Sequence, residues 1–226
     1  MSRVLVIPDL HLPVAHSEAL RFCVDIYNQW SCDRVVFIGD VVDHHAISFH
    51  SKNPNCPSAA HEYDMVREQL YQWRDTFPVA AVTIGNHDNR PQRVAEDAGM
   101  PDVYMRNLKE LWETPLWRWD YSIEIDDVYY FHGIGGGKTP ALNKANTMGM
   151  SVVMGHCHSV FGTHWGAGPK KRWFGCDCGC LIDNEAWQFA YGKHMSKKPI
   201  LGCAVVIDGT PYLEPMPCGK GEEYHG

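Results

Sequence analysis

The sequence lacks any apolar run long enough to cross a membrane, and it lacks an excess of positive charge. A membrane-spanning helix needs about 20 mostly apolar residues, whereas the first apolar run, Val4–Ile7, is too short even for a signal peptide. With 20 Lys and Arg against 27 Asp and Glu, the net charge of −7 gives no general attraction to nucleic acid or anionic lipid. We therefore expect a cytoplasmic protein that does not bind membranes.

The sequence also shows no linker, internal repeat or low-complexity segment. Its 226 residues, 45% of them apolar, fit one domain that buries a hydrophobic core. We expect a single domain over residues 1–215, followed by a flexible C-terminal tail over residues 216–226. The sequence carries no signal for an oligomeric state.

The nine cysteines are the least usual part of the composition. An odd number in a chain without a secretion signal predicts reduced thiols. Cys176, Cys178 and Cys180 would share one face of a strand, where we favour small buried thiols that pack a sheet. The alternative is a structural zinc or redox cluster, with a fourth ligand from His164, Cys157 or Cys203.

Short apolar runs that end at Gly or Pro predict the first strands, at Val4–Ile7, Arg34–Ile38 and Val79–Ile84. Helical spacing predicts helices between them, at Glu18–Gln29 and His61–Phe77. This alternation favours parallel strands with helical crossovers.

The second half of the chain predicts mostly short strands. Expected helices are Gln92–Ala98 and Val103–Leu111; expected strands are Tyr121–Ile125 and Val128–His132 in a hairpin around Asp126-Asp127, then Ser151–Met154, Thr163–Trp165, Arg172–Cys178, Gly202–Ile207 and Tyr212–Leu213. These later strands favour antiparallel pairing. We therefore predict an α/β fold with two mixed β-sheets packed face to face and helices on both outer sides.

Five short polar blocks follow or end these predicted strands. They are Asp9-Leu-His11, Gly39-Asp40-Val-Val-Asp43, Gly85-Asn86-His87-Asp88, His132-Gly133 and Gly155-His156-Cys-His158. Ligands bind at the carboxyl ends of strands in open α/β sheets, so one edge of the structure would gather all five blocks. Asp, His and Asn suit Mn, Fe, Zn or Co. Two such ions, about 3.5–4 Å apart, can activate water and hold a phosphoryl group.

As an ordered set, the blocks resemble the calcineurin-like metallophosphoesterase superfamily, over Val4 to His158. The resemblance implies the αββα sandwich of that family and two divalent metal ions, drawn from Mn²⁺, Fe²⁺ or Fe³⁺, Zn²⁺, Ni²⁺ and Co²⁺. It implies that Asp9, His11 and His158 bind one ion, that Asn86, His132 and His156 bind the other, and that Asp40 bridges both.

The same resemblance implies a mechanism. A metal-bridging hydroxide attacks phosphorus in line, and His87 protonates the departing oxygen. Asp43 orients His87 and favours its charged form.

The sequence departs from the protein phosphatases of this superfamily. Where they carry phosphate-binding arginines, this chain has His44-His45 after Asp43 and Ile84 before Gly85. The pattern favours a small single-domain phosphoesterase that acts on phosphodiesters of the nucleotide or nucleic-acid type. The alternatives are a phosphomonoesterase, acting on proteins or small molecules, and a non-catalytic metal-binding scaffold.

Arg90, His44 and Lys138 are candidate substrate contacts. An equally good interpretation of Arg90 is a charged side chain on a helix that faces solvent. Lys138 lies in the glycine-rich loop Gly133–Thr139, which departs from the Walker pattern because His132 stands where that pattern needs Gly; we expect a flexible loop beside the metal site. For the basic stretch Lys170-Lys171-Arg172, a solvated loop is favoured over a guide for a nucleic-acid strand.

Overall fold

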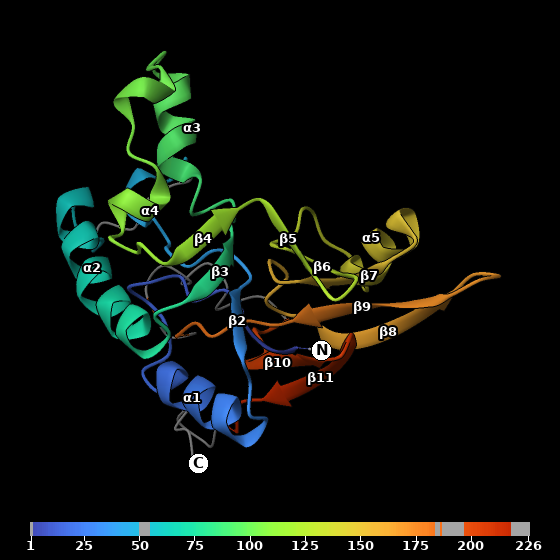
Figure 1. Cartoon of the computed structure of the whole chain (residues 1–226). Helices are drawn as coiled ribbons and strands as arrows, with labels where there is room; N and C mark the ends of the chain where they lie inside the picture. The colour runs from blue at the N-terminus through green and yellow to red at the C-terminus, as the bar shows by residue number, and fades with distance from the viewer. Residues whose placement is uncertain (1, 50–54, 184–185, 187–196, 218–226) are drawn as a thin grey trace.

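The structure is a computed structural model that describes residues 2–49, 55–183, 186 and 197–217 (Figure 1). It contains two mixed β-sheets. The six-stranded sheet has the order β11-β10-β1-β2-β3-β4 and the five-stranded sheet the order β5-β6-β7-β9-β8. The strand bounds are β1 Arg3–Ile7, β2 Arg34–Phe37, β3 Ala80–Thr83, β4 Trp117–Asp120, β5 Ser122–Ile125, β6 Val128–Phe131, β7 Ser151–Met154, β8 Phe161–Ala167, β9 Arg172–Cys178, β10 Gly202–Ile207 and β11 Thr210–Pro215.

The helices are short, apart from α1 and α2. Their bounds are α1 Ala19–Gln29, α2 Ala59–Thr76, α3 Arg90–Asp97, α4 Leu108–Leu111 and α5 Pro140–Met148, with 3-10 turns η1 His45–Ile47 and η2 Asp102–Tyr104. Helices α1 and α2 lie on one side of the molecule, α5 lies beyond the second sheet, and α3 projects away from both sheets (Figure 1). None of the helices in the described ranges is both long and apolar enough to span a membrane.

Two apolar clusters produce this layering. The cluster between the sheets joins Val6 and Ile38 of the first sheet to Val153, Phe174 and Cys176 of the second. The larger cluster packs the other face of the first sheet against the apolar sides of α1 and α2. Alternate residues of β1 therefore face different clusters, as a strand buried on both faces requires.

The predicted fold class is confirmed: two mixed sheets pack face to face with helices outside. Strands β1 to β4 are parallel, as the alternation of strands and helices indicates. The hairpin at Asp126-Asp127 is also present, and both turn residues have positive φ.

The later strands pair mostly antiparallel, as expected, at β5–β6, β8–β9, β1–β10 and β10–β11, whereas β7 pairs in parallel with both β6 and β9. One predicted helix was wrong. A single helix over Val103–Leu111 is replaced by η2 and α4, since Asn107 caps a new helix by accepting the N–H of Glu110 at 2.9 Å. Strand β4 and helix α5 were not predicted.

The predicted C-terminal tail lies largely outside the described residues, which end at 217. Its first residue, Met216, is buried, and its N–H donates to the carbonyl oxygen of Leu201 at 2.9 Å.

Candidate metal centre

The five polar blocks meet at one edge of the two sheets. Asp9 and His11 follow β1, Asp40 follows β2, and Asn86 follows β3. His132 follows β6, and the remaining block follows β7 in the second sheet. Because all these strands point their carboxyl ends the same way, side chains more than 100 residues apart in sequence come into contact.

The first group of side chains that could hold a metal ion consists of Asp9, His11 and His158, whose ligand atoms lie within 4.8 Å of one another. His158 Nε2 lies 3.3 Å from Asp9 Oδ1 and 3.2 Å from His11 Nε2. Asp9 and His11 are fully buried. The group therefore offers two imidazole nitrogens and a carboxylate to one point.

The second group consists of Asp40, His132 and His156. His132 Nε2 lies 3.1 Å from Asp40 Oδ2 and 3.2 Å from His156 Nδ1. The same nitrogen lies 3.2 Å from Oδ1 of Asn86, which adds a neutral oxygen to the group.

Asp40 links the two groups. Its Oδ2 lies 3.6 Å from His11 Nε2 on one side and 3.1 Å from His132 Nε2 on the other. Its second oxygen, Oδ1, accepts the backbone N–H of His87 at 2.8 Å, which fixes the orientation of the carboxylate. One oxygen atom is thus free to serve both groups.

The donor atoms fit divalent cations. His132 Nδ1–H donates to the carbonyl oxygen of Ile38 at 3.0 Å, so Nε2 is the ring atom that points at the oxygens of Asp40 and Asn86. An imidazole whose other nitrogen bonds a carbonyl or carboxylate is the usual arrangement of a metal-binding histidine. His11 shows the same arrangement, because its Nδ1 lies 2.8 Å from Asp43 Oδ1.

The electrostatics also favour a positive charge here. Burial alone would raise the pKa of Asp40, but the nearby His132 and other histidines hold it well below its usual value. Burial alone would lower the pKa of His132, yet Asp40 and Asp9 raise it to about 10. The carboxylates therefore stabilise a cation between them, either a proton on imidazole or a metal ion.

Backbone strain is concentrated at this edge. Asp9, His11, Asp40 and His156 all have positive φ, between 26° and 66°, a region that non-glycine residues rarely adopt. The neighbouring glycines leave room for the carboxylates, because a Cβ at Gly85 would overlap Asp40 and one at Gly155 would overlap Asp9.

His87 contacts Asp43 and, with His11 and Asp40, forms a third group of side chains that could hold a metal ion. His87 Nδ1 lies 2.8 Å from Asp43 Oδ1 and 2.9 Å from the Asp43 carbonyl oxygen. Burial opposes a charge on His87, but the bond to Asp43 raises its pKa. The imidazole Nε2 points back toward the cluster, 4.0 Å from Asp40 Oδ2, and the side chain is 22% exposed.

The residues predicted to contact substrate have different surroundings. Arg90 is buried, and its Nη1 donates to the carbonyl oxygens of Asp43 at 2.8 Å and His44 at 2.9 Å, while Nη2 lies 3.3 Å from His87 Nε2. It is therefore not a solvated helix charge. His44 Nδ1–H donates to the carbonyl oxygen of His87 at 2.9 Å. Lys138 is exposed in the glycine-rich loop that precedes α5.

Two buried carboxylates that brace the site were not predicted. Asp88 accepts the N–H of Val42 at 3.1 Å and that of Gly85 at 2.9 Å, joining the second and third blocks. Burial and the nearby Asp40 raise its pKa to about 7. Glu62 of α2 accepts the N–H groups of His45 at 2.6 Å and Ala46 at 2.9 Å. Asp88 is the fourth residue of the block that begins at Gly85, so the sequence pointed to it. No motif in the sequence pointed to Glu62.

The three clustered cysteines belong to the core. Cys176 and Cys178 lie in the cluster between the sheets, and Cys180 packs against Ile182. All three are free and buried. Over the ranges that the structure describes, no group of potential metal ligands includes a cysteine.

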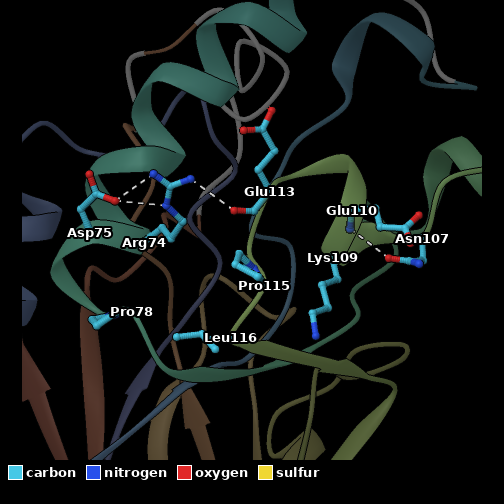
Figure 2. Close-up of a pocket in the computed structure, with 9 residues that line it drawn as sticks. All are labelled: Arg74, Asp75, Pro78, Asn107, Lys109, Glu110, Glu113, Pro115 and Leu116. Carbon is cyan, nitrogen blue, oxygen red and sulfur yellow. Dashed lines mark hydrogen bonds and ion pairs between the residues drawn. The ribbon is translucent and has the colours of Figure 1, made fainter.

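A pocket of about 920 Å³ lies elsewhere, between the end of α2 and the segment from α4 to β4 (Figure 2). Arg74 lines it, bonded to the Asp75 carboxylate and to the Glu113 carbonyl oxygen. None of the metal-binding side chains lines this pocket, so it is separate from the candidate centre.

The comparisons with known proteins agree with this geometry. A sequence profile described as calcineurin-like phosphoesterase matches residues 2–178. No curated protein matches the chain in sequence.

Several solved structures are similar to the chain, each at 13% identity. Vps29 of Chaetomium thermophilum matches 100% of this chain and 95% of that chain, with a TM-score of 0.46. Yfce, a phosphoesterase from E. coli, matches 91% and 88%, with a TM-score of 0.41. The nuclease MPE of Pseudomonas putida matches 94% and 86%, with a TM-score of 0.38.

Proposed function

The chain belongs to the calcineurin-like phosphoesterase family, and from this premise we propose that it is a phosphodiesterase that uses two divalent metal ions. The observation that carries the proposal is the position of Asp40 Oδ2, between His11 Nε2 at 3.6 Å and His132 Nε2 at 3.1 Å. One carboxylate oxygen shared by two sets of nitrogen ligands suits a pair of ions.

In this proposal, Asp9, His11 and His158 hold one ion and Asn86, His132 and His156 hold the other, with Asp40 shared. When bound, the two ions would supply Lewis acidity, which lowers the pKa of water and neutralises phosphoryl oxygens. Manganese, iron, zinc, nickel and cobalt all accept this mixture of imidazole, carboxylate and amide ligands.

The residues of the chain itself position the leaving group and move a proton. Hydrolysis forms a P–O bond to water and breaks the P–O bond to the leaving group. Asp43 fixes His87 Nδ1 through two contacts, so Nε2 is the atom that faces the substrate. A proton held at Nε2 passes to the departing oxygen, and the ring regains a proton from solvent. General acid catalysis of this kind contributes about 10²–10⁴-fold.

A diester is the preferred substrate class in this proposal. The chain has no arginine directly after Asp43 or before Gly85, so it lacks the fixed cations that would bind the extra charge of a monoester. Arg90 replaces them only in part, because its Nη1 donates to two backbone carbonyl oxygens and only Nη2 lies near the reacting group, 3.3 Å from His87 Nε2.

Hydrolysis of bis-p-nitrophenyl phosphate and p-nitrophenyl phosphate tests the proposal, with each divalent ion added to metal-free protein. We expect the diester to be cleaved faster, in the presence of Mn²⁺ or Ni²⁺, by protein that contains two ions per chain. Faster cleavage of the monoester would favour a phosphomonoesterase. Metal-loaded, folded protein that cleaves neither would favour a non-catalytic metal-binding scaffold.

A further inference from the structure

An exposed aromatic side chain is connected to the proposed proton donor through two arginines of α3. Phe49 is 54% exposed, and the guanidinium carbon of Arg93 lies 5.2 Å from the centre of its ring. Arg93 is itself exposed and sits one turn along α3 from Arg90, a rise of about 4.5 Å. Arg90 in turn lies 3.3 Å from His87 Nε2. The aromatic ring and Arg93 therefore lie where η1 packs against α3, the helix whose Arg90 contacts His87.

The backbone that leads to Phe49 is fixed at two points, to α2 and to α3. The buried Glu62 accepts two N–H groups of η1, which ends two residues before Phe49. Arg90 of α3 donates to the carbonyl oxygens of Asp43 and His44, just before η1. The helix that carries Arg93 and the turn that leads to Phe49 are thus held to each other by the bonds from Arg90 to the carbonyl oxygens of Asp43 and His44.

The side occupied by His87 is the side on which the leaving group departs, because the ring that protonates the departing oxygen must contact it. A solvent-facing aromatic ring stacks on the face of a nucleobase, and an arginine beside it adds a cation–π contact and positive charge. An exposed phenylalanine has no such use in a site that releases a small alcohol.

We propose that Phe49 and Arg93 form a subsite that binds the nucleobase of the leaving nucleoside. The proposal rests on the proposed phosphodiesterase function and names its substrate class: a nucleotide diester or single-stranded nucleic acid. The subsite recognises the aromatic face of the base. Because every base has such a π face, we expect little preference among the four bases.

The test compares dithymidine monophosphate with two analogues that each lack one thymine base. Product analysis shows which nucleoside leaves without the phosphate. For the wild-type protein, we expect removal of that base to lower kcat/KM about tenfold, within the range that base–aromatic stacking gives. Removal of the other base should have a smaller effect. In Phe49→Ala the preference for the intact leaving nucleoside should disappear, whereas Phe49→Trp should retain it.

Tyr212→Ala is the matched control, because Tyr212 is an exposed aromatic residue on β11, at an outer edge of the first sheet. It should keep the wild-type preference. An equal preference in wild type and Phe49→Ala, or an equal loss in Phe49→Ala and Tyr212→Ala, would overturn the subsite.

Binding separates this proposal from the proposed function. Titration calorimetry of dithymidine monophosphate, and of its abasic analogues, into His87→Ala and into His87→Ala with Phe49→Ala does not depend on turnover. Affinity that depends on the base and requires Phe49 would support the subsite, even if the wild-type protein cleaved no ester. Absence of cleavage would then reject only the proposed hydrolysis. Cleavage of bis-p-nitrophenyl phosphate without any base-dependent affinity would reject only the subsite.

Discussion

Asp43 Oδ1 lies 2.8 Å from His87 Nδ1, and the same oxygen atom lies 2.8 Å from His11 Nδ1. One carboxylate oxygen therefore orients a proposed proton donor and a proposed metal ligand at once. Burial alone would raise the pKa of Asp43, but its bonds to the two imidazoles lower it below its usual value. Asp43 stays ionised and holds both rings with Nδ1–H toward it, which leaves both Nε2 atoms directed at the centre.

Asp43→Asn should damage metal binding and catalysis together. An amide keeps the shape but removes the charge that both rings share, and loss of a side chain that orients a metal ligand typically costs about 10–100-fold in affinity or activity. We expect losses of that size in kcat and in the affinity for the ion near His11, measured by metal titration and steady-state kinetics. Asp97→Asn, at an exposed position of α3, is the control. A loss in kcat with unchanged metal affinity would contradict the shared role.

His87→Ala should separate catalysis from metal binding. His87 contacts Asp43, and its Nε2 is 4.0 Å from Asp40 Oδ2, so the proposed ligands remain when the ring is removed. We expect kcat for bis-p-nitrophenyl phosphate to fall about 10²–10⁴-fold while elemental analysis still finds two ions per chain. His61→Ala, at an exposed position of α2, should retain activity. Loss of an ion from His87→Ala would make His87 a ligand instead.

Asp40→Ala should have a larger effect on metal content than His158→Ala. Asp40 Oδ2 lies near ligands of both groups, whereas His158 belongs to the group of Asp9 and His11. We expect Asp40→Ala to lose both ions and His158→Ala to keep one, as measured by elemental analysis after dialysis. Removal of the ions from the wild-type protein by a chelator should lower its Tm in thermal unfolding, because ligands that bind the folded state stabilise it. Equal metal contents in the two variants would exclude a shared carboxylate.

The sequence predicted this centre well because its ligands follow strands. Once Val4–Ile7 and Arg34–Ile38 are identified as parallel strands, the positions of Asp9 and Asp40 at one edge follow from topology. The contact between Asp43 and His87 was available only through the family resemblance. The burial of Arg90 was not available at all, since it depends on two carbonyl oxygens in a loop some 46 residues away in sequence.

Of the two missed elements, only helix α5 had local signals. Helix α5 begins with Pro140 and ends before Gly149, which has a φ of 63°; proline at the start and glycine after the end are standard helix boundaries. The glycine-rich loop before it was interpreted as a flexible loop beside the metal site, and the helix that follows the loop was missed. Strand β4 is four residues long and is followed almost directly by β5, so neither periodicity nor a turn residue separated it from its neighbours.

Gly85→Ala should disrupt the centre through packing alone. A Cβ at this position would overlap the carboxylate and the backbone nitrogen of Asp40, and backbone atoms cannot move aside cheaply. We expect reduced metal content and a lower Tm, measured by elemental analysis and thermal unfolding. Gly136→Ala is a matched control for both readouts, because a Cβ there meets no atom within 4 Å and its φ is not in the left-handed region. If both variants bind two ions equally well, the close approach at Gly85 does not constrain Asp40.

Asp177, which belongs to none of the groups that could hold a metal ion, should make stability depend on pH. Its side chain is buried on β9; Oδ1 accepts the N–H of Ala141 at 3.2 Å, and Oδ2 has no partner among the residues that the structure describes. Burial raises its pKa to about 7 from 3.8. Since the folded pKa lies above the unfolded one, the contribution of Asp177 to stability is full below about pH 4 and is lost as the pH rises to about 7.

Asp177→Asn keeps the acceptor oxygen for Ala141 and removes the charge. We expect the variant and the wild type to have similar free energies of unfolding near pH 4, and the variant to become more stable as the pH rises. Above pH 7 the difference should reach at most about 4 kcal/mol, since one pKa unit corresponds to about 1.4 kcal/mol. Urea unfolding of both proteins across this range, at one metal concentration, measures the difference. A difference that stays constant with pH would show that Asp177 does not titrate in the folded protein.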